Sequence, residues 1–558
     1  MLRYASLLTV LLIAACGPSD RLDVILEGGW VVDGSGNPGY RADVGVRGDR
    51  IIVIGSLGNV DARRRIDVTD LIVAPGFIDM LGWSEIRVLA DGRAASKITQ
   101  GITTEVTGEG TSVAPQTQAT IAEDAEYHAS LGVTIDWLDL DGYFEHFERS
   151  GSTINLATFV GATQVRRIVL GDEDRAPSPE ELQRMTALVE SAMMQGALGI
   201  STSLVYAPAF YASTDELIAL ARAARQYGGV YATHVRNEGA AMDDALDEAL
   251  TVAREAHIPV EIWHIKRAGR ENWGDMGRML ARIDSARAAG IDITADLYPY
   301  QAGAAPLSAS IPQWAHEGGS DSLIARLGNP AMRASMRAEI TGPSAGIQNF
   351  YRDAGGGAGV LASGIFADSL KYLEGKSIQQ IAAIWGVDPE DALFDLLIKD
   401  DANTGAIYFM MQESDVREAI QAPWTSFCTD FGAVGPDGVL SRDKVHPRVY
   451  GSFPRILGRY VREHRLISLE EAVRKMTSLP AQRVGLLERG ILRPGMAADI
   501  AVFDAQTIID RATFEDPHQL SEGMLYVLVN GQLAVDDGQI TDARPGRGLR
   551  GPGWIADR

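Results

Sequence analysis

Two histidines end two consecutive strand-like runs, and their spacing suits them to hold a metal ion. His234 ends Gly-Val-Tyr-Ala-Thr-His, and His264 ends Pro-Val-Glu-Ile-Trp-His. A strand–helix–strand repeat places the carboxyl ends of successive parallel strands side by side. Two neutral imidazoles at that edge can ligate one ion. The spacing therefore predicts a metal site at the mouth of a barrel.

A carboxylate ends a later strand-like run in the same manner. Asp430 closes Trp-Thr-Ser-Phe-Cys-Thr-Asp, with Ser426 and Cys428 beneath it on the same strand face. Three ligating or acid/base side chains at the ends of three strands are far less expected by chance than one.

The elements that must position these residues alternate between strands and helices. Clear amphipathic helices are expected at 179–195, opened by Ser178, and at 240–257. This order predicts an α/β fold, a (β/α)8 TIM-like barrel over residues 73–484. An insertion at about 300–420, glycine-rich over 342–364, is expected to fold over the mouth as a lid. The candidate strands are 73–79, 103–108, 155–161, 198–204, 230–235, 260–265, 291–297 and 424–430.

Short strands with turn residues between them occupy both ends of the chain. They fall within 22–72 and again after Leu492-Arg493-Pro494-Gly495. Neither end alone has enough strands to bury a face. Residues 21–72 and 485–558 are therefore predicted to form one small β-sandwich domain.

Composition limits the partners. The 558 residues are 46% hydrophobic and carry a net charge of −23. Such a surface argues against nucleic acid as a partner, because phosphate binding requires a basic surface. The two cysteines, Cys16 and Cys428, do not form a disulfide framework.

Residues 1–20 are predicted to be an export signal and tether. Arg3 precedes an apolar run that is too short to span a bilayer, followed by Ile13-Ala14-Ala15-Cys16. This segment looks like a bacterial lipobox, with Cys16 as the lipidated residue. We expect a periplasm-facing protein attached to the cell envelope by a lipid anchor alone, with the outer membrane favoured by Gly17. The alternative is ordinary signal cleavage with Cys16 incidental.

Several segments together resemble the amidohydrolase superfamily, and most closely its D-aminoacylase (N-acyl-D-amino-acid deacylase) branch. The resemblance runs from about residue 23 to about 535. It is carried by Pro75-Gly76-Phe77-Ile78-Asp79, Thr233-His234-Val235-Arg236-Asn237-Glu238, Trp263-His264-Ile265-Lys266, Thr429-Asp430, His446-Pro447-Arg448, Lys475-Met476-Thr477-Ser478-Leu479-Pro480-Ala481 and Leu492-Arg493-Pro494-Gly495-Met496-Ala497-Ala498-Asp499.

The resemblance implies a barrel with a β-sandwich and a water activated by Zn2+. His234 and His264 would be metal ligands. Asp430 would be the general acid/base that takes the proton of the water and returns it to the leaving amine. The other interpretations are satisfied core histidines, and a strand-end cap or surface aspartate at Asp430.

The chain departs from the family at two metal-binding positions. Leu81 and Trp83 stand where active members carry His-x-His, so a second ion is not expected. The family cysteine of the second strand is also missing, and Glu109 is its obvious substitute. A one-zinc site of His234, His264 and Glu109 is the predicted set. Glu109 as a loop carboxylate remains open, as does Cys428 as an extra ligand.

Four residues are candidates for binding an anionic substrate. Lys266 lies two residues beyond His264 on the same face. The resemblance assigns Arg448 to the substrate carboxylate, which suits a planar guanidinium. It also places Tyr206 and Tyr298 in the pocket wall, and Tyr298 could donate to the substrate carbonyl. Ordinary ion pairs and aromatic wall residues are the alternatives.

The sequence thus predicts a metal-dependent hydrolase of linear amides adjacent to a carboxylate, such as N-acyl-D-amino acids or peptides with D-residues. One alternative is a cyclic-amide hydrolase of the hydantoinase or dihydroorotase kind. The other is a ligand-binding protein on a barrel that has lost catalysis, and the missing His-x-His is its best support.

Overall fold

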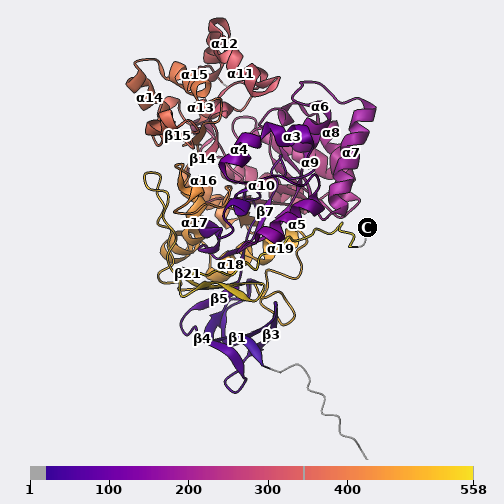
Figure 1. Ribbon diagram of the computed structural model, residues 1–558, viewed down its shortest axis with the longest axis vertical. Helices are drawn as coiled ribbons and strands as arrows, with labels where there is room; N and C mark the ends of the chain where they lie inside the picture. The colour runs from indigo at the N-terminus through magenta and orange to yellow at the C-terminus, as the bar shows by residue number, and fades with distance from the viewer. Residues whose placement is uncertain (1–20, 344–345, 557–558) are drawn as a thin grey trace, which may run out of the picture.

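The computed structural model describes residues 21–343 and 346–556. A β domain, a central barrel and a mainly helical insertion follow one another along the long axis (Figure 1). The predicted export signal and Cys16 lie outside the described residues. Within those residues, no helix is both long and apolar enough to cross a bilayer.

The β domain combines both ends of the chain in one sheet of nine strands. Its order is β21-β20-β19-β18-β5-β1-β2-β3, and β4 pairs with β1. The two ends meet where β5 and β18 run antiparallel, with Ala74 opposite Ala501. The strands are β1 (Leu22–Val31), β2 (Tyr40–Arg47), β3 (Arg50–Gly55), β4 (Ala62–Asp67), β5 (Ile72–Pro75), β18 (Ile500–Phe503), β19 (Met524–Val529), β20 (Gln532–Asp536) and β21 (Gln539–Ile540).

Two boundaries differ from the sequence prediction. The run 73–79 is two strands divided at Gly76, because β5 pairs in the β domain and β6 (Phe77–Asp79) in the barrel. The tail beyond β21 also leaves the β domain. The amide of Leu549 donates to the carbonyl of Leu156 at 2.8 Å, so this segment lies against a barrel strand.

The barrel is made of parallel strands that close into a ring. The chain runs from β8 directly into β9, so a three-stranded and a six-stranded sheet join at Phe159. The ring closes where the amide of Met80 donates to the carbonyl of Phe427 at 3.3 Å, and Gly82 pairs with Phe431. The strands are β6, β7 (Ile102–Thr107), β8 (Asn155–Thr158), β9 (Val160–Gly161), β10 (Gly199–Ser203), β11 (Val230–His234), β12 (Val260–Ile262), β13 (Ile293–Leu297) and β17 (Thr425–Phe427).

Amphipathic helices cover the outside of the barrel. The predicted helix at 179–195 is α7 (Pro179–Met194), whose capping box joins Ser178 and Glu181. The predicted helix at 240–257 is α9 (Met242–Ala256). The other outer helices include α5 (Leu140–Ser150), α6 (Ala162–Leu170), α8 (Thr214–Arg225), α10 (Met276–Ala288), α16 (Glu413–Gln421) and α18 (Leu469–Met476).

The insertion between β13 and β17 forms a unit of its own and reaches the barrel mouth. The Oε1 atom of Gln348 accepts the amide of Glu238 at 2.6 Å. The ring of Phe350 stacks on Tyr206 with centroids 6.3 Å apart. Its elements include β14 (Gly303–Pro306), α11 (Gly319–Leu327), α12 (Pro330–Thr341), α13 (Phe350–Asp353), β15 (Val360–Ser363), α14 (Ile378–Trp385), α15 (Pro389–Lys399) and β16 (Gly405–Tyr408).

Candidate active site

Three buried side chains converge at the carboxyl ends of three barrel strands. Oε1 of Glu109 lies 2.9 Å from Nδ1 of His234 and 3.5 Å from Nε2 of His264. The two imidazole rings are 4.4 Å apart between centroids and inclined at 81°. One potential ligand atom from each residue lies within 4.8 Å of the other two. The predicted set of His234, His264 and Glu109 is therefore brought together in space.

The strands explain this convergence. Glu109 follows β7 by two residues, His234 is the last residue of β11, and His264 follows β12 by two residues. Because parallel barrel strands end on one face, side chains at these positions meet although up to 155 residues separate them. His264 has a φ of 36° at the point where its strand ends, and a positive φ is uncommon for a residue other than glycine.

The donor set fits zinc. Two imidazole nitrogens and a carboxylate oxygen are the ligand types of open, catalytic zinc sites. Burial alone would raise the pKa of Glu109, but the two imidazoles hold that pKa well below its usual range. Such a polar cluster is costly when empty, which favours a bound cation.

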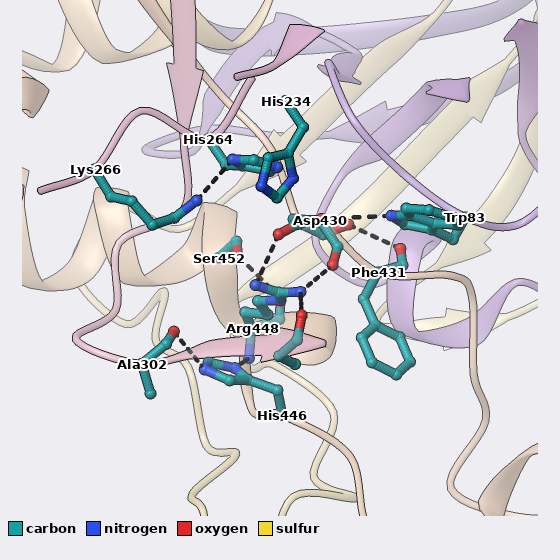
Figure 2. Close-up of polar contacts among 12 residues, drawn as sticks. Trp83, His234, His264, Lys266, Ala302, Asp430, Phe431, His446, Arg448 and Ser452 are labelled. Carbon is teal, nitrogen blue, oxygen red and sulfur yellow. Dashed lines mark hydrogen bonds and ion pairs between the residues drawn. The ribbon is translucent and has the colours of Figure 1, made fainter. Parts of the chain in front are cut away.

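Asp430 faces the two histidines from the end of β17, as Figure 2 shows. Its Oδ2 atom forms an ion pair with Nη1 of Arg448 at 2.8 Å. Its Oδ1 atom accepts a long hydrogen bond from the indole Nε1 of Trp83 at 3.4 Å. Burial and Lys266 lower the pKa of His264, but Asp430, Glu109 and Glu238 together raise that pKa to about 10. Asp430 is therefore electrostatically part of the same site.

The four predicted substrate-binding residues also border the site. Nζ of Lys266 lies 2.7 Å from Nδ1 of His264. The guanidinium carbon of Arg448 lies 4.4 Å from the ring centroid of Tyr298, and Nζ of Lys266 lies 5.6 Å from it. The ring of Tyr206 packs edge-on to His234 with centroids 5.4 Å apart. Two cations and two aromatic rings thus surround the candidate metal ligands.

Glu238 is a site residue to which sequence reasoning assigned no role. Its Oε1 lies 3.1 Å from Nδ1 of His264, and its Oε2 lies 3.6 Å from Nε2 of His234. Oε1 also pairs with Nζ of Lys266. The sequence signal that could have found it was its position four residues after His234 in a family-like segment.

A buried ionic cluster beneath the mouth was also missed. Nζ of Lys97 lies 2.8 Å from Oδ2 of Asp79 and 3.0 Å from Oε2 of Glu105, and all three side chains are fully buried. Nζ also donates to the hydroxyl of Thr429 and to the carbonyl of Phe431 at 2.6 Å. These two residues flank Asp430, so the cluster holds the segment that carries it.

Cys428 lies outside the ligand group. It is buried, and burial raises the pKa of its thiol well above the usual value, with Asp296 adding to the effect. Among the described residues, the group of three side chains that could hold a metal ion consists of Glu109, His234 and His264. A protonated, buried thiol is consistent with a core residue.

The fold and the site together define a class of protein. A (β/α)8 barrel with a small β domain and a His-His-carboxylate cluster at the carboxyl ends of its strands is the framework of a metal-dependent hydrolase. The amidohydrolase family model matches residues 64–535, and the chain belongs to that family.

Relatives match along almost the whole chain. An N-acyl-D-glutamate deacylase of Alcaligenes xylosoxydans xylosoxydans is 38% identical over 96% of this chain and 98% of its own length. A D-aminoacylase from the same organism is 36% identical over 95% of this chain and 98% of its own length.

A crystal structure of N-acyl-D-glutamate deacylase from Bordetella bronchiseptica, complexed with zinc and a phosphonate inhibitor, is 35% identical. It covers 95% of this chain and 100% of its own, with a TM-score of 0.79. A D-aminoacylase structure, described by one-metal activation and second-metal attenuation, is 36% identical with a TM-score of 0.78 over 95% of this chain and 100% of its own. The chain is thus an amidohydrolase, an enzyme that acts on carbon–nitrogen bonds.

Proposed function

We propose that this protein deacylates N-acyl-D-amino acids with one zinc ion held by Glu109, His234 and His264. The observation that carries the proposal is that potential ligand atoms of these three side chains lie within 4.8 Å of one another. The relatives that match along almost the whole chain are an N-acyl-D-glutamate deacylase and a D-aminoacylase. When bound, zinc lowers the pKa of a water molecule and polarises the scissile carbonyl.

Asp430 is placed to move the proton of the reaction. It takes the proton from the attacking water and returns it to the leaving amine. Nη1 of Arg448 lies 2.8 Å from Oδ2 of Asp430 and balances its charge, and the indole Nε1 of Trp83 lies 3.4 Å from Oδ1. These two contacts keep the carboxylate turned toward the histidines (Figure 2).

Arg448 and Lys266 are suited to bind the carboxylate of the substrate. Both are buried beside Tyr298, and each already pairs with an acid, Arg448 with Asp430 and Lys266 with Glu238. A substrate carboxylate would share these cations with the two acids. Burial raises the pKa of Tyr298 to about 12, so its hydroxyl keeps its proton near neutral pH. Tyr298 can therefore donate to the carbonyl oxygen as negative charge develops there.

The first barrel strand supports the proposal of a single ion. Leu81 and Trp83 have no atom that ligates zinc, and both lie next to Asp430: the amide of Asp430 donates to the carbonyl of Leu81 at 2.9 Å. A relative whose structure is described by one-metal activation supports catalysis with one ion.

Metal analysis and a substrate panel test the proposal. The purified protein is expected to contain close to one zinc, which a His234→Ala/His264→Ala variant loses. It is expected to release amino acid from N-acyl-D-amino acids and to leave the rings of hydantoin and dihydroorotate unopened. A protein that retains zinc but cleaves none of the N-acyl-D- or N-acyl-L-amino acids and D-dipeptides would contradict the proposal and favour a binding protein.

We propose separately that Cys16 anchors the protein to the cell envelope, on the basis of the lipobox-like Ile13-Ala14-Ala15-Cys16. The wild-type protein expressed in a bacterium is expected in the outer-membrane fraction and to incorporate labelled fatty acid. Cys16→Ala is expected to abolish the label. A wild-type protein that carries no label and fractionates with soluble periplasmic proteins would contradict the anchor.

A further inference from the structure

Glu238 contacts both ligand histidines on the side that faces away from Glu109. Nδ1 of His234 and Nε2 of His264 face Glu109, at 2.9 and 3.5 Å. The remaining ring nitrogens face Glu238: Nε2 of His234 lies 3.6 Å from Oε2, and Nδ1 of His264 lies 3.1 Å from Oε1. One carboxylate thus spans the outer nitrogens of two imidazoles.

The chemistry of imidazole makes this arrangement consequential. A neutral ring has one nitrogen with a lone pair and one that carries hydrogen, and a partner of the second nitrogen decides which is which. A ring that offers Nε2 to a cation carries its hydrogen on Nδ1, and only an acceptor can satisfy it. Lys266 is a donor, so of the two groups that contact Nδ1 of His264, Glu238 is the one that fits this state.

Two buried atoms in this region lack partners. Oε2 of Glu238 and Nε2 of His234 are both buried without a hydrogen bond, and they lie 3.6 Å apart. That distance is a few tenths of an ångström beyond an N–H···O hydrogen bond. A small approach of the two groups would satisfy both, and Nδ1 of His234 would then keep its lone pair for the cation.

The charge and the backbone of Glu238 suit the same role. Oε1 of Glu238 also pairs with Nζ of Lys266, and a carboxylate beside a cation has two oxygens that accept hydrogen bonds. The backbone amide of Glu238 donates a hydrogen bond to Oε1 of Gln348 in the insertion at 2.6 Å. The backbone carbonyl of Glu238 accepts one from the amide of Ala268 at 2.8 Å. The carboxylate is therefore presented from a fixed loop.

We propose that Glu238 is a positioning residue that accepts hydrogen bonds from both ligand histidines and so fixes which nitrogen of each ring offers its lone pair to the metal. This inference rests on the proposed function. It also gives the insertion a task at the barrel mouth, because Gln348 holds the loop that carries Glu238.

Zinc affinity, measured by competition with a chromogenic chelator, tests the role directly. Glu238→Gln replaces one of the two accepting oxygens with an NH2 donor, so only one histidine keeps its acceptor; zinc binding is expected to weaken by about 10- to 100-fold, the usual effect of losing the partner of a ligating histidine. Glu238→Asp keeps the charge beside Lys266 but withdraws the carboxylate, and is expected to weaken binding by a smaller factor. Glu216→Gln is the matched control, because Glu216 is a buried carboxylate whose ion-pair partner is Arg166 at 2.7 Å. It is expected to keep wild-type affinity.

The outcomes separate this inference from the proposed function. A wild-type protein that binds no zinc contradicts the proposed function. A wild-type protein that binds zinc, with Glu238→Gln or Glu238→Asp folded and within twofold of its affinity, overturns the role of Glu238. If Glu238→Gln does not fold, the Glu238→Asp affinity decides. Equal weakening in the Glu216→Gln control would also overturn the proposal, since the effect would then be a general loss of buried charge.

Discussion

The indole nitrogen of Trp83 lies 3.4 Å from Oδ1 of Asp430, so a residue at a first-strand position where the family carries histidine contacts the proposed acid/base. Nη1 of Arg448 forms an ion pair with the other carboxylate oxygen, Oδ2, at 2.8 Å. Asp430 itself has a φ of 48°, a conformation that is uncommon for a non-glycine residue. Its carboxylate is therefore held on both sides by neutral and cationic donors.

Restoring the family histidines is expected to restore a second ion. In Leu81→His/Trp83→His, two imidazoles would stand beside Asp430, and zinc per protein is expected to rise from one to two by elemental analysis after dialysis. Trp83→Phe removes the indole donor without adding a ligand and is expected to stay at one. A double variant that also stays at one would show that the backbone no longer accommodates the second ion.

Asp430→Asn is expected to retain zinc and to lose about 10²- to 10⁴-fold in kcat, because an amide cannot take the proton of the water. Elemental analysis and steady-state kinetics on an N-acyl-D-amino acid measure the two effects. Asp510→Asn removes a comparable partly buried pair, with Arg455 at 2.8 Å, and is expected to keep kcat. Substantial residual turnover in Asp430→Asn would assign the proton transfer to another group.

Lys97→Met is expected to lower the free energy of unfolding by about 3 to 5 kcal/mol, because it leaves Asp79 and Glu105 as buried charges without a cation. Denaturant unfolding measures the change. Lys371→Met breaks two more exposed pairs, with Glu374 at 3.0 Å and Asp443 at 2.5 Å, and is expected to cost about 1 kcal/mol. Equal costs for the two variants would mean that the buried cluster contributes no more than a surface pair.

The stability of the insertion is expected to depend on the ionisation of Asp353. Burial, with Glu271 and Glu238 adding to it, raises the pKa of Asp353 from 3.8 to about 7. The folded state then holds a proton that the unfolded state releases, so stability present below about pH 4 is lost as the pH rises to about 7. Asp353→Asn removes this penalty and can still accept from Gln348, which donates to Oδ2 of Asp353 at 2.6 Å.

At pH 8 the variant is therefore expected to be more stable than the wild type, by up to about 4 kcal/mol at about 1.4 kcal/mol per pKa unit. At pH 4 the two are expected to unfold alike. Melting temperatures at both pH values check the difference. A gain of equal size at pH 4 and pH 8 would mean that packing, and not ionisation, is responsible.

Much of the framework followed from patterns along the chain. The alternation of strands and helices predicted the barrel. The helix that Ser178 caps begins at Pro179, where its capping residues indicated. His234 and His264 were recognisable because each ends an apolar run of strand period. The β domain from the two chain ends was predictable because too few strands lay at either end alone. These are local signals, since periodicity and capping act over a few residues.

Other features were decided only by the tertiary structure. Glu109 lies 125 residues before His234, and nothing local distinguishes a ligand from a loop carboxylate. Glu238 could not be assigned its two contacts, because each depends on the distance between loops after different strands. Lys97 carries no sign of burial in its own helix turn, yet it lies between two carboxylates from separate strands. A sequence pattern determines which face a side chain takes along its own element, whereas the closure of the ring determines which side chains from distant elements meet.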